Sequence, residues 1–289
     1  MSRPGSTSEA PAGGSPPVGE APVARRASRL AAGGRRALDL LPLAIVAVAA
    51  VCGVALSGDT AGRLAPTRAW CAPSFARPLG CGEAGVDLLA LVSSAELRAI
   101  ALAVMVALVG LAVGTPLGAA AALARGRFER AVERACDLVQ AFPSFILALA
   151  VLSAVRRPSR VHIGVVFALT AWAPFARLAL AQTRVLRGTA FVEAALALGR
   201  SRAGVLARHV VPNLFGVVAV QLGATAAAVV VSEAGLAFVG LGPPDGVSLG
   251  GVLDQGVAAM LRAPHVLVVG ATAVFGTSAA LLAAGRALR

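Results

Sequence analysis

Side chains that could carry out chemistry are scarce in this sequence and lie far apart along it. All 26 basic residues are arginine, which excludes a phosphate-binding loop with its lysine and a lysine that forms a Schiff base. His162, His209 and His265 are scattered and do not form a metal-ligand motif with cysteine or acidic residues. They indicate no nucleophile–histidine–acid arrangement either. We therefore expect no catalytic residue and no metal site in this chain.

The residues from 190 to 213 have types and spacing that suggest a surface contact rather than catalysis. Helix-forming residues run up to Gly199, which fits a helix end, and Ser201 fits the cap of a second short helix. Pro212 fits the first turn of the apolar helix that follows. Four residues share one face of the first short helix: Val192, Ala195, Leu196 and Gly199. An exposed apolar stripe of this kind predicts a docking surface for another protein, and the nearby arginines also fit a helix lying on a bilayer.

The elements that must position this segment are long and apolar. The chain of 289 residues is 57% hydrophobic and 14% charged, far from the composition of a soluble domain. Crossing a bilayer takes about 20 helical residues, and six segments approach or reach that length. They are Leu40–Ser57, Ala99–Ala124, Leu138–Val155, Val161–Gln182, Leu214–Leu241 and Ala263–Gly285. Lipid offers no partner to backbone groups, and the short alternating strands of a barrel are absent. The sequence predicts an all-α membrane protein with six transmembrane helices.

The distribution of arginine predicts the orientation of these helices. With both termini inside, the inner segments hold 18 arginines and the outer segments hold 8, which favours an N-in, C-in topology. This places residues 190–213 in the cytoplasm, between the fourth and fifth helices, and it explains the net charge of +12 without nucleic-acid binding. The outer turn Arg156–Arg160 is an exception for which we have no account.

Composition also divides the chain into two parts. Residues 1–37 are rich in Ser, Pro, Gly, Ala and Arg and are expected to form a disordered cytoplasmic tail. Residues 38–289 form the expected transmembrane domain, with an outer loop at 58–97. Cys71 and Cys81 fall in that loop, where either a disulfide or two free thiols would fit.

Two features within the spans suggest helix packing or an ion site. Gly110, Gly114 and Gly118 repeat every four residues, which predicts a close contact with another helix. Glu233 lies inside the fifth span, where an acid is either a functional group of the pathway or a structural charge near the outer interface. Asp137, at the inner edge of the third span, is expected to be a structural charge beside Arg134.

The segment 190–213 resembles the EAA loop of ABC-importer permeases. The matching residues are Glu193, Ala194, Ala195, Gly199, His209, Val211 and Pro212. The string from Arg208 to Asn213 is similar to the peptide and nickel branch of that family, as are residues 140–144 and 232–242. The long N-terminal tail, with Gly85 and Asp87 before the second span, resembles the C-type subunit. The resemblance covers about residues 40–289.

The resemblance implies a permease subunit of an ATP-driven, binding-protein-dependent importer in the bacterial cytoplasmic (inner) membrane. It implies a second homologous permease, two cytoplasmic ATPase subunits and an extracytoplasmic solute-binding protein as partners, besides the lipid bilayer. ATP and magnesium would bind the ATPases, and this chain would bind no cofactor and catalyse no reaction. Seven residues would couple to the ATPase: Glu193, Ala194, Ala195, Gly199, His209, Pro212 and Asn213.

Other assignments and the identity of the cargo stay open. A secondary transporter would need internal repeats and several paired intramembrane charges, and the spans show no repeat and one interior acid. A polytopic protein that is not coupled to an ATPase is the other alternative. Peptides, nickel-type solutes and related cargo all fit the branch. Residues 81–87 and the short loop after Gly242 depart from the family pattern on the outer side, where the cargo and the binding protein make contact.

Overall fold

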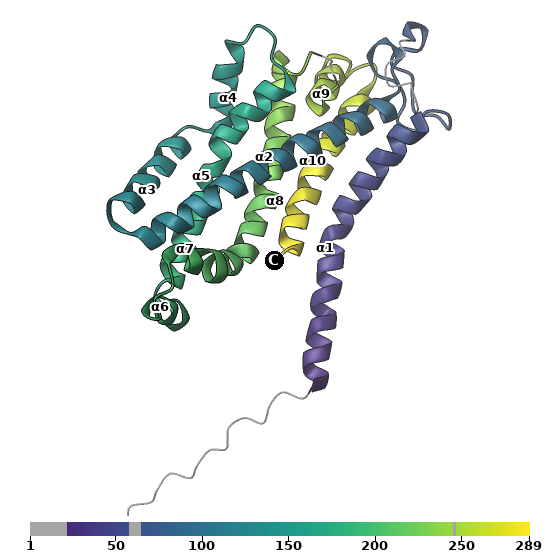
Figure 1. Cartoon of the computed structure of the whole chain (residues 1–289). Helices are drawn as coiled ribbons and strands as arrows, with labels where there is room; N and C mark the ends of the chain where they lie inside the picture. Colours follow the sequence, from purple (N-terminus) through teal and green to yellow (C-terminus); the bar gives the residue numbers. More distant parts are fainter. Residues whose placement is uncertain (1–21, 58–64, 245–246) are drawn as a thin grey trace, which may run out of the picture. The chain divides into compact units, whose positions relative to one another are not determined.

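The computed structural model describes residues 22–57, 65–244 and 247–289 (Figure 1). The chain divides into two units, Met1–Arg35 and Arg36–Arg289. Helix α1 (Pro22–Ser57) begins in the first unit and continues into the second. Of the tail expected at residues 1–37, residues 1–21 lie outside the described part. The helix begins upstream of residue 38 because residues 22–37 are rich in alanine and arginine, which favour helix.

Nine further α-helices lie in the described part of the second unit. They are α2 (Leu88–Ala124), α3 (Gly126–Ala141), α4 (Ser144–Ser153), α5 (Arg160–Leu186), α6 (Ala190–Ala197), α7 (Arg202–Val205), α8 (Val211–Leu236), α9 (Leu249–Ala258) and α10 (Pro264–Ala287). Two 3₁₀ turns, Pro66–Arg68 and Glu83–Gly85, precede α2, and π-helical turns at Leu206–Val210 and Ala237–Leu241 flank α8. The expectation of an all-α protein is confirmed.

Five described helical segments are long and apolar enough to cross a membrane, and a bent pair of helices raises the number to six. The five are Leu38–Leu56, Leu88–Ala124, Arg160–Leu186, Arg202–Leu241 and Pro264–Ala287. Each contains or overlaps most of a span expected from the sequence. Pro174 lies inside α5 without ending it.

The third expected span, Leu138–Val155, is not the single helix that we predicted. Helix α3 ends at Ala141 and α4 begins at Ser144, with an angle of 68° between them. The break lies at Phe142–Pro143, because proline has no N–H to donate and disfavours the helical conformation of the residue before it. Phe142 is accordingly extended, with φ −99° and ψ 127°.

The second expected span is longer than we predicted, and the outer loop expected at 58–97 is correspondingly shorter. Helix α2 begins at Leu88, where the Asp87 side chain caps it by accepting a hydrogen bond of 2.9 Å from the Leu89 N–H. Glu96 falls within the loop expected at 58–97 and lies in α2 instead. In the structure the Thr277 hydroxyl of α10 donates to Glu96 Oε1 at 3.2 Å, so this acid has a partner within the helical bundle.

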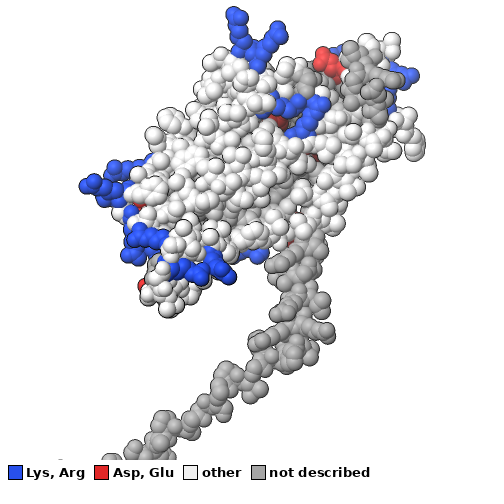
Figure 2. Space-filling view, in the orientation of Figure 1, with Lys and Arg blue, Asp and Glu red and all other residues white. Residues whose placement is uncertain are grey.

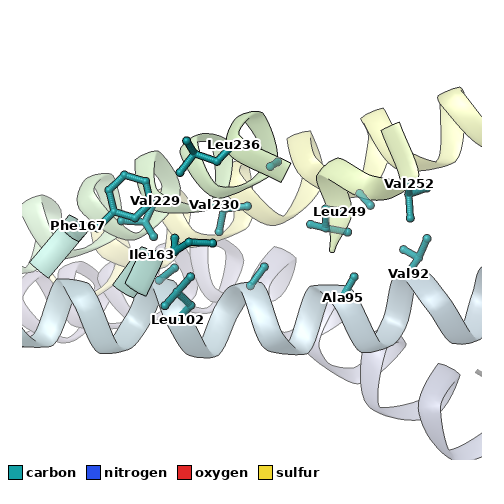
Figure 3. Packing of buried hydrophobic residues seen from close by; sticks show 14 of the residues in the cluster. Val92, Ala95, Leu102, Ile163, Phe167, Val229, Val230, Leu236, Leu249 and Val252 are labelled. Atoms are coloured by element: carbon teal, nitrogen blue, oxygen red, sulfur yellow. The ribbon is translucent and has the colours of Figure 1, made fainter. Parts of the chain in front are cut away.

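Helix α2 organises the core because it packs against α5, α8 and α10 (Figure 1). In the main cluster of buried residues, Leu102 of α2 lies near Ile163 and Phe167 of α5 and Val230 of α8 (Figure 3). Leu249 and Val252 of α9 belong to the same cluster. A second cluster, at the other end of α2, joins α2, α5 and α8 to the segment 190–210.

Candidate functional site

The segment that the sequence singled out forms a hairpin of α6, α7 and the π-helical turn Leu206–Val210, here called the α6–α7 hairpin (residues 190–210). Glu193 lies in the first turn of α6, where the helix dipole favours a carboxylate, and its side chain is exposed. Ala194 is exposed and Ala195 is half-buried. Their short side chains leave this surface of α6 open to a partner.

The turn of the hairpin is fixed by Gly199 and Ser201. Gly199 has a φ of +79°, in the left-handed region that favours glycine, and the Arg200 N–H donates back to the Ala195 carbonyl at 3.2 Å. This is the Schellman arrangement, which ends a helix and satisfies one of its last carbonyls. The Ser201 hydroxyl accepts from the Gly204 N–H at 3.2 Å and so caps α7. These two hydrogen bonds fix the reversal of the chain between α6 and α7.

The inner face of the hairpin is anchored in the helical bundle. Val192, Val205 and Val210 are fully buried in one cluster with residues of α2, α5 and α8. The stripe that we expected to be exposed is therefore partly wrong, because Val192 packs inside the protein. Among the described side chains, Phe191 of α6 and Leu198, directly after α6, are accessible apolar residues, 45% and 87% exposed. The side chain of Leu196, the other large residue of the expected stripe, lies outside the described part.

His209, Pro212 and Asn213 connect the hairpin to α8. The His209 ring lies 6.3 Å from the Phe191 ring, centroid to centroid, and the two rings are tilted by 49°. Pro212 occupies the first turn of α8, as the sequence predicts. Asn213 Nδ2 donates to the His209 carbonyl at 2.6 Å, so this side chain holds the junction between the π-helical turn and α8.

A hollow of about 560 Å³ opens between the two arms of the hairpin. Its lining includes Phe191, Ala194, Leu198, Arg200 and His209. Arginine side chains gather at the end of the molecule where α6 and α7 lie (Figure 2). The arrangement offers an open apolar depression with a basic rim, which suits docking of a protein side chain.

The glycine repeat of α2 lies directly against the backbone of α5. A methyl group added at Gly110, Gly114 or Gly118 would lie 2.7, 2.2 or 2.0 Å from a carbonyl oxygen of α5. The carbonyls belong to Ala171, Trp172 and Ala176, in that order. The absence of side chains on this face of α2 therefore permits the close approach of the two helices.

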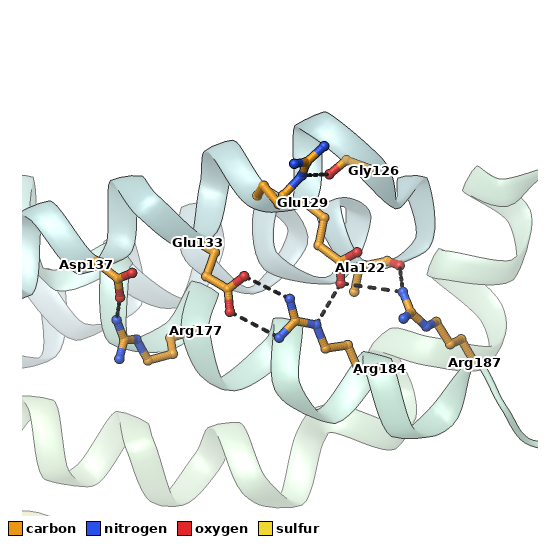
Figure 4. Close-up of polar contacts among 9 residues, drawn as sticks. Ala122, Gly126, Glu129, Glu133, Asp137, Arg177, Arg184 and Arg187 are labelled. Carbon is orange, nitrogen blue, oxygen red and sulfur yellow. Dashed lines mark hydrogen bonds and ion pairs between the residues drawn. The ribbon is translucent and has the colours of Figure 1, made fainter.

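A ladder of ion pairs ties α3 to α5 beside this contact (Figure 4). Arg184 donates to both oxygens of Glu133, at 3.1 and 3.0 Å, and to Glu129 at 2.7 Å. Arg187 donates to the Ala122 carbonyl of α2 at 2.7 Å. Asp137, which we expected to be a structural charge, pairs with Arg177 of α5.

Glu233 lies one turn before the end of α8 and is 3% exposed. Its Oε2 atom has no hydrogen-bond partner among the described residues. Its position near a helix end supports the structural alternative.

The loop before α2 is held by a disulfide between Cys71 and Cys81. The Cys81 N–H also donates to the Cys71 carbonyl at 2.9 Å, and Arg77 donates to the Gly85 carbonyl at 3.2 Å. The other two cysteines, Cys52 and Cys136, are free.

Sequence reasoning missed a group of uncharged polar side chains that the structure brings together. They line a cavity of about 370 Å³ between α3, α4, α5 and α8. Six polar residues take part: Gln140, Ser144, Thr170, Gln221, Thr225 and Ser232. The spacing of Gln221, Thr225 and Ser232, by four and then seven residues within an apolar span, is the signal that would have found the α8 part.

No group of three or more histidine, cysteine or acidic residues in the described ranges could hold a metal ion. The expected coupling residues gather in the hairpin and at its junction with α8. The glycine repeat, Glu233 and the disulfide lie in other parts of the structure.

Comparison with known proteins gives consistent matches. The family described as "Binding-protein-dependent transport system inner membrane component" matches residues 114–285. Glutathione transport system permease protein GsiD of Shigella dysenteriae serotype 1 is 34% identical over 218 residues, which cover 75% of this chain and 72% of that protein. The same-named proteins of Escherichia coli O6:K15:H31 and Pectobacterium atrosepticum are 33% and 31% identical over equal shares.

Proposed function

Because this chain belongs to the family of binding-protein-dependent transport system inner-membrane components, we propose that it couples partner ATPases to solute import through its α6–α7 hairpin. Members of this family are non-catalytic membrane permeases with several spans. The likeness of this chain to the C-type permeases of the peptide and nickel branch indicates the subunits with which it assembles. That assembly comprises a second permease, two ATPases and an extracytoplasmic binding protein.

One observation carries the coupling role. The hairpin buries its inner valines completely in the bundle and leaves an apolar hollow open on its outer side. A segment that is anchored on one side and open on the other transmits force to the bundle without unfolding. The exposed Leu198 and the carboxylate of Glu193 supply apolar contact and charge for the ATPase surface.

The connection to α8 supports a mechanical link. Helix α7, the π-helical turn Leu206–Val210 and α8 follow one another without an intervening loop. A displacement of the hairpin therefore acts on α8 directly, and through Val192 and Val205 on α2 and α5. ATP can shift the transporter between two conformations only by the difference in its affinity for them. The hairpin must therefore be stiff, so that the movement of the ATPases reaches the helices of the permease. The cap at Ser201 and the Schellman turn supply this stiffness.

The orientation with both termini in the cytoplasm follows from the arginine distribution and puts the hairpin on the ATPase side. The relatives named above are glutathione transport system permeases. We infer a peptide-type solute as cargo for this chain.

The test compares two leucine-to-aspartate variants at opposite regions of the chain. Leu198, directly after α6, is 87% exposed, and Leu261, after α9, is 99% exposed. Both variants should fold, because neither side chain is packed. In the complex assembled with its ATPases, Leu198→Asp should abolish uptake and reduce ATPase co-purification by at least tenfold, whereas Leu261→Asp should retain both ATPases. Equal ATPase retention and uptake by Leu198→Asp and the wild type would refute the coupling role.

A further inference from the structure

The polar cavity between α3, α4, α5 and α8 lies at the depth where a membrane helix is least able to tolerate polar groups. Thr225 is 14 residues from Val211 and 11 residues from Leu236, so it lies near the middle of α8. Polar residues at mid-membrane are costly unless they face a cavity or the inside of a bundle, and they usually mark a pathway. Gln221 and Ser232 lie on the same face of α8 as Thr225 and line the same cavity.

The helix break at Phe142–Pro143 is an independent sign that water reaches this cavity. Phe142, Pro143 and Ser144 all line it. Non-helical backbone at membrane depth is tolerated where it is buried in protein or lines a water-filled space, because its free N–H and C=O groups need partners. Phe142 is exposed and extended, so water rather than protein is the hydrogen-bond partner available to the free backbone groups of the break in this chain.

The lining offers hydrogen bonds without formal charge. None of the residues that line the cavity is acidic or basic. Along the chain, Glu233 directly follows Ser232, but it is 3% exposed and does not line the cavity. Asp137 and Arg177, each about one helical turn from a lining residue, pair with each other. Gln221 Nε2 donates to Thr225 Oγ1 at 3.1 Å, which leaves the amide oxygen of Gln221 and the hydroxyl hydrogen of Thr225 for a solute.

We propose that this cavity is a cargo-contact site in which Gln221, Thr225 and Gln140 exchange hydrogen bonds with uncharged amide groups of the passing solute. A primary amide presents a donor and an acceptor, which match the N–H and C=O of a peptide bond. The volume of about 370 Å³ falls in the range of small-molecule sites. This inference rests on the proposed role as an importer permease, and it assigns residues to the passage of cargo.

The first experiment tests whether water and solute reach the cavity, and it does not depend on the identity of the cargo. Cysteine is introduced at Thr225 or at Val231 in the assembled transporter, after replacement of the free Cys52 and Cys136. Thr225 is half-buried, whereas Val231 of the same helix is 52% exposed but does not line the cavity. If the labelling rate followed the exposed fraction of each residue, Val231→Cys would be labelled faster than Thr225→Cys. Our proposal predicts the opposite order.

The reagents are a cationic and an anionic methanethiosulfonate of similar size. Both should label Thr225→Cys at least tenfold faster than Val231→Cys. Their two rates at Thr225→Cys should agree within about threefold once normalised to free cysteine, because the lining carries no charge. Labelling of Thr225→Cys as slow as that of Val231→Cys would mean that the second permease covers this face, and it would overturn the proposal.

The second experiment tests the hydrogen bonds with glutathione as the probe, in proteoliposomes with the binding protein. Gln221→Leu should lower the maximal uptake rate by about fivefold, the effect of one lost hydrogen bond, and raise the ATP consumed per solute. Val231→Leu is the matched control on the same helix and should transport like the wild type. Equal maximal rates for Gln221→Leu and wild type would overturn the role of Gln221. Failure of the wild type to import glutathione would instead count against the proposed cargo class, and the labelling experiment would still decide the cavity.

Discussion

Replacing Gly118 by alanine sets two contributions to stability against each other within one helix. Alanine has the higher helix propensity, by about 1 kcal/mol, which alone would stabilise α2. The added methyl group, however, would lie 2.0 Å from the Ala176 carbonyl oxygen, 2.7 Å from its carbonyl carbon and 2.8 Å from its Cα. All three atoms are backbone, so no side chain can rotate away.

The size of the effect follows from the separation that the methyl group demands. Ordinary van der Waals contact begins near 3.4 Å, so α2 and α5 would have to part by about 1.4 Å at this point. A gap of that size removes more than half of the dispersion attraction between neighbouring atoms. Overpacking of this kind costs about 3 kcal/mol, the upper part of its usual range, because only backbone can yield. After the gain in propensity, we expect a net loss of about 2 kcal/mol.

The assay is unfolding in mixed micelles by titration with sodium dodecyl sulfate, followed by circular dichroism. Gly276→Ala is the matched control, because Gly276 lies inside α10 and a methyl group added there has no neighbour within 4 Å. The control should be as stable as the wild type or more stable. Gly118→Ala with a midpoint at or above that of the wild type would refute the packing argument.

Three further predictions concern the ion pairs, the hairpin turn and the thiols. Arg184→Leu should lower the free energy of unfolding by about 2–3 kcal/mol in the same titration, because Glu129, whose side chain is 11% exposed, loses its closest cation. Arg177→Leu, from a half-exposed pair, should lower it by about 0–1 kcal/mol. Gly199→Ala should strain the left-handed turn by about 1 kcal/mol and slow uptake more than Gly199→Asn, since asparagine tolerates this conformation; equal rates in transport assays would contradict this. Maleimide counting on denatured protein should find two thiols before reduction and four after it, and four before reduction would contradict the disulfide.

Local rules predicted the hairpin well. The left-handed turn at Gly199 after α6, the cap at Ser201 and the proline in the first turn of α8 each follow from the conformational preference of one residue type. The exposed face of α6 could not be predicted in the same way. Periodicity identifies an apolar stripe, but only the fold tells whether Val192 packs against its own bundle or faces a partner.

Long-range pairing explains the other differences. Glu96 and Asp137 are charged residues whose partners, Thr277 and Arg177, are distant in the sequence, so neither contact could be derived from local pattern. The break at Phe142–Pro143 was within reach of the sequence, because the rule for proline is local, although our expected span Leu138–Val155 ran through it. The polar cavity needed the fold, since Gln140 of α3 and Gln221 of α8 come to line one cavity only in the folded chain.

The contact between the hairpin and an ATPase is tested most directly by photo-crosslinking in the intact transporter. A benzophenone amino acid is placed at Leu198 or, as the control, at Leu261, and both sites are exposed enough to accept it. We predict an adduct between Leu198 and an ATPase subunit, formed in inverted membrane vesicles, and no ATPase adduct from Leu261. An adduct of Leu198 with the extracytoplasmic binding protein, or no ATPase adduct from Leu198 in an actively transporting complex, would contradict the account.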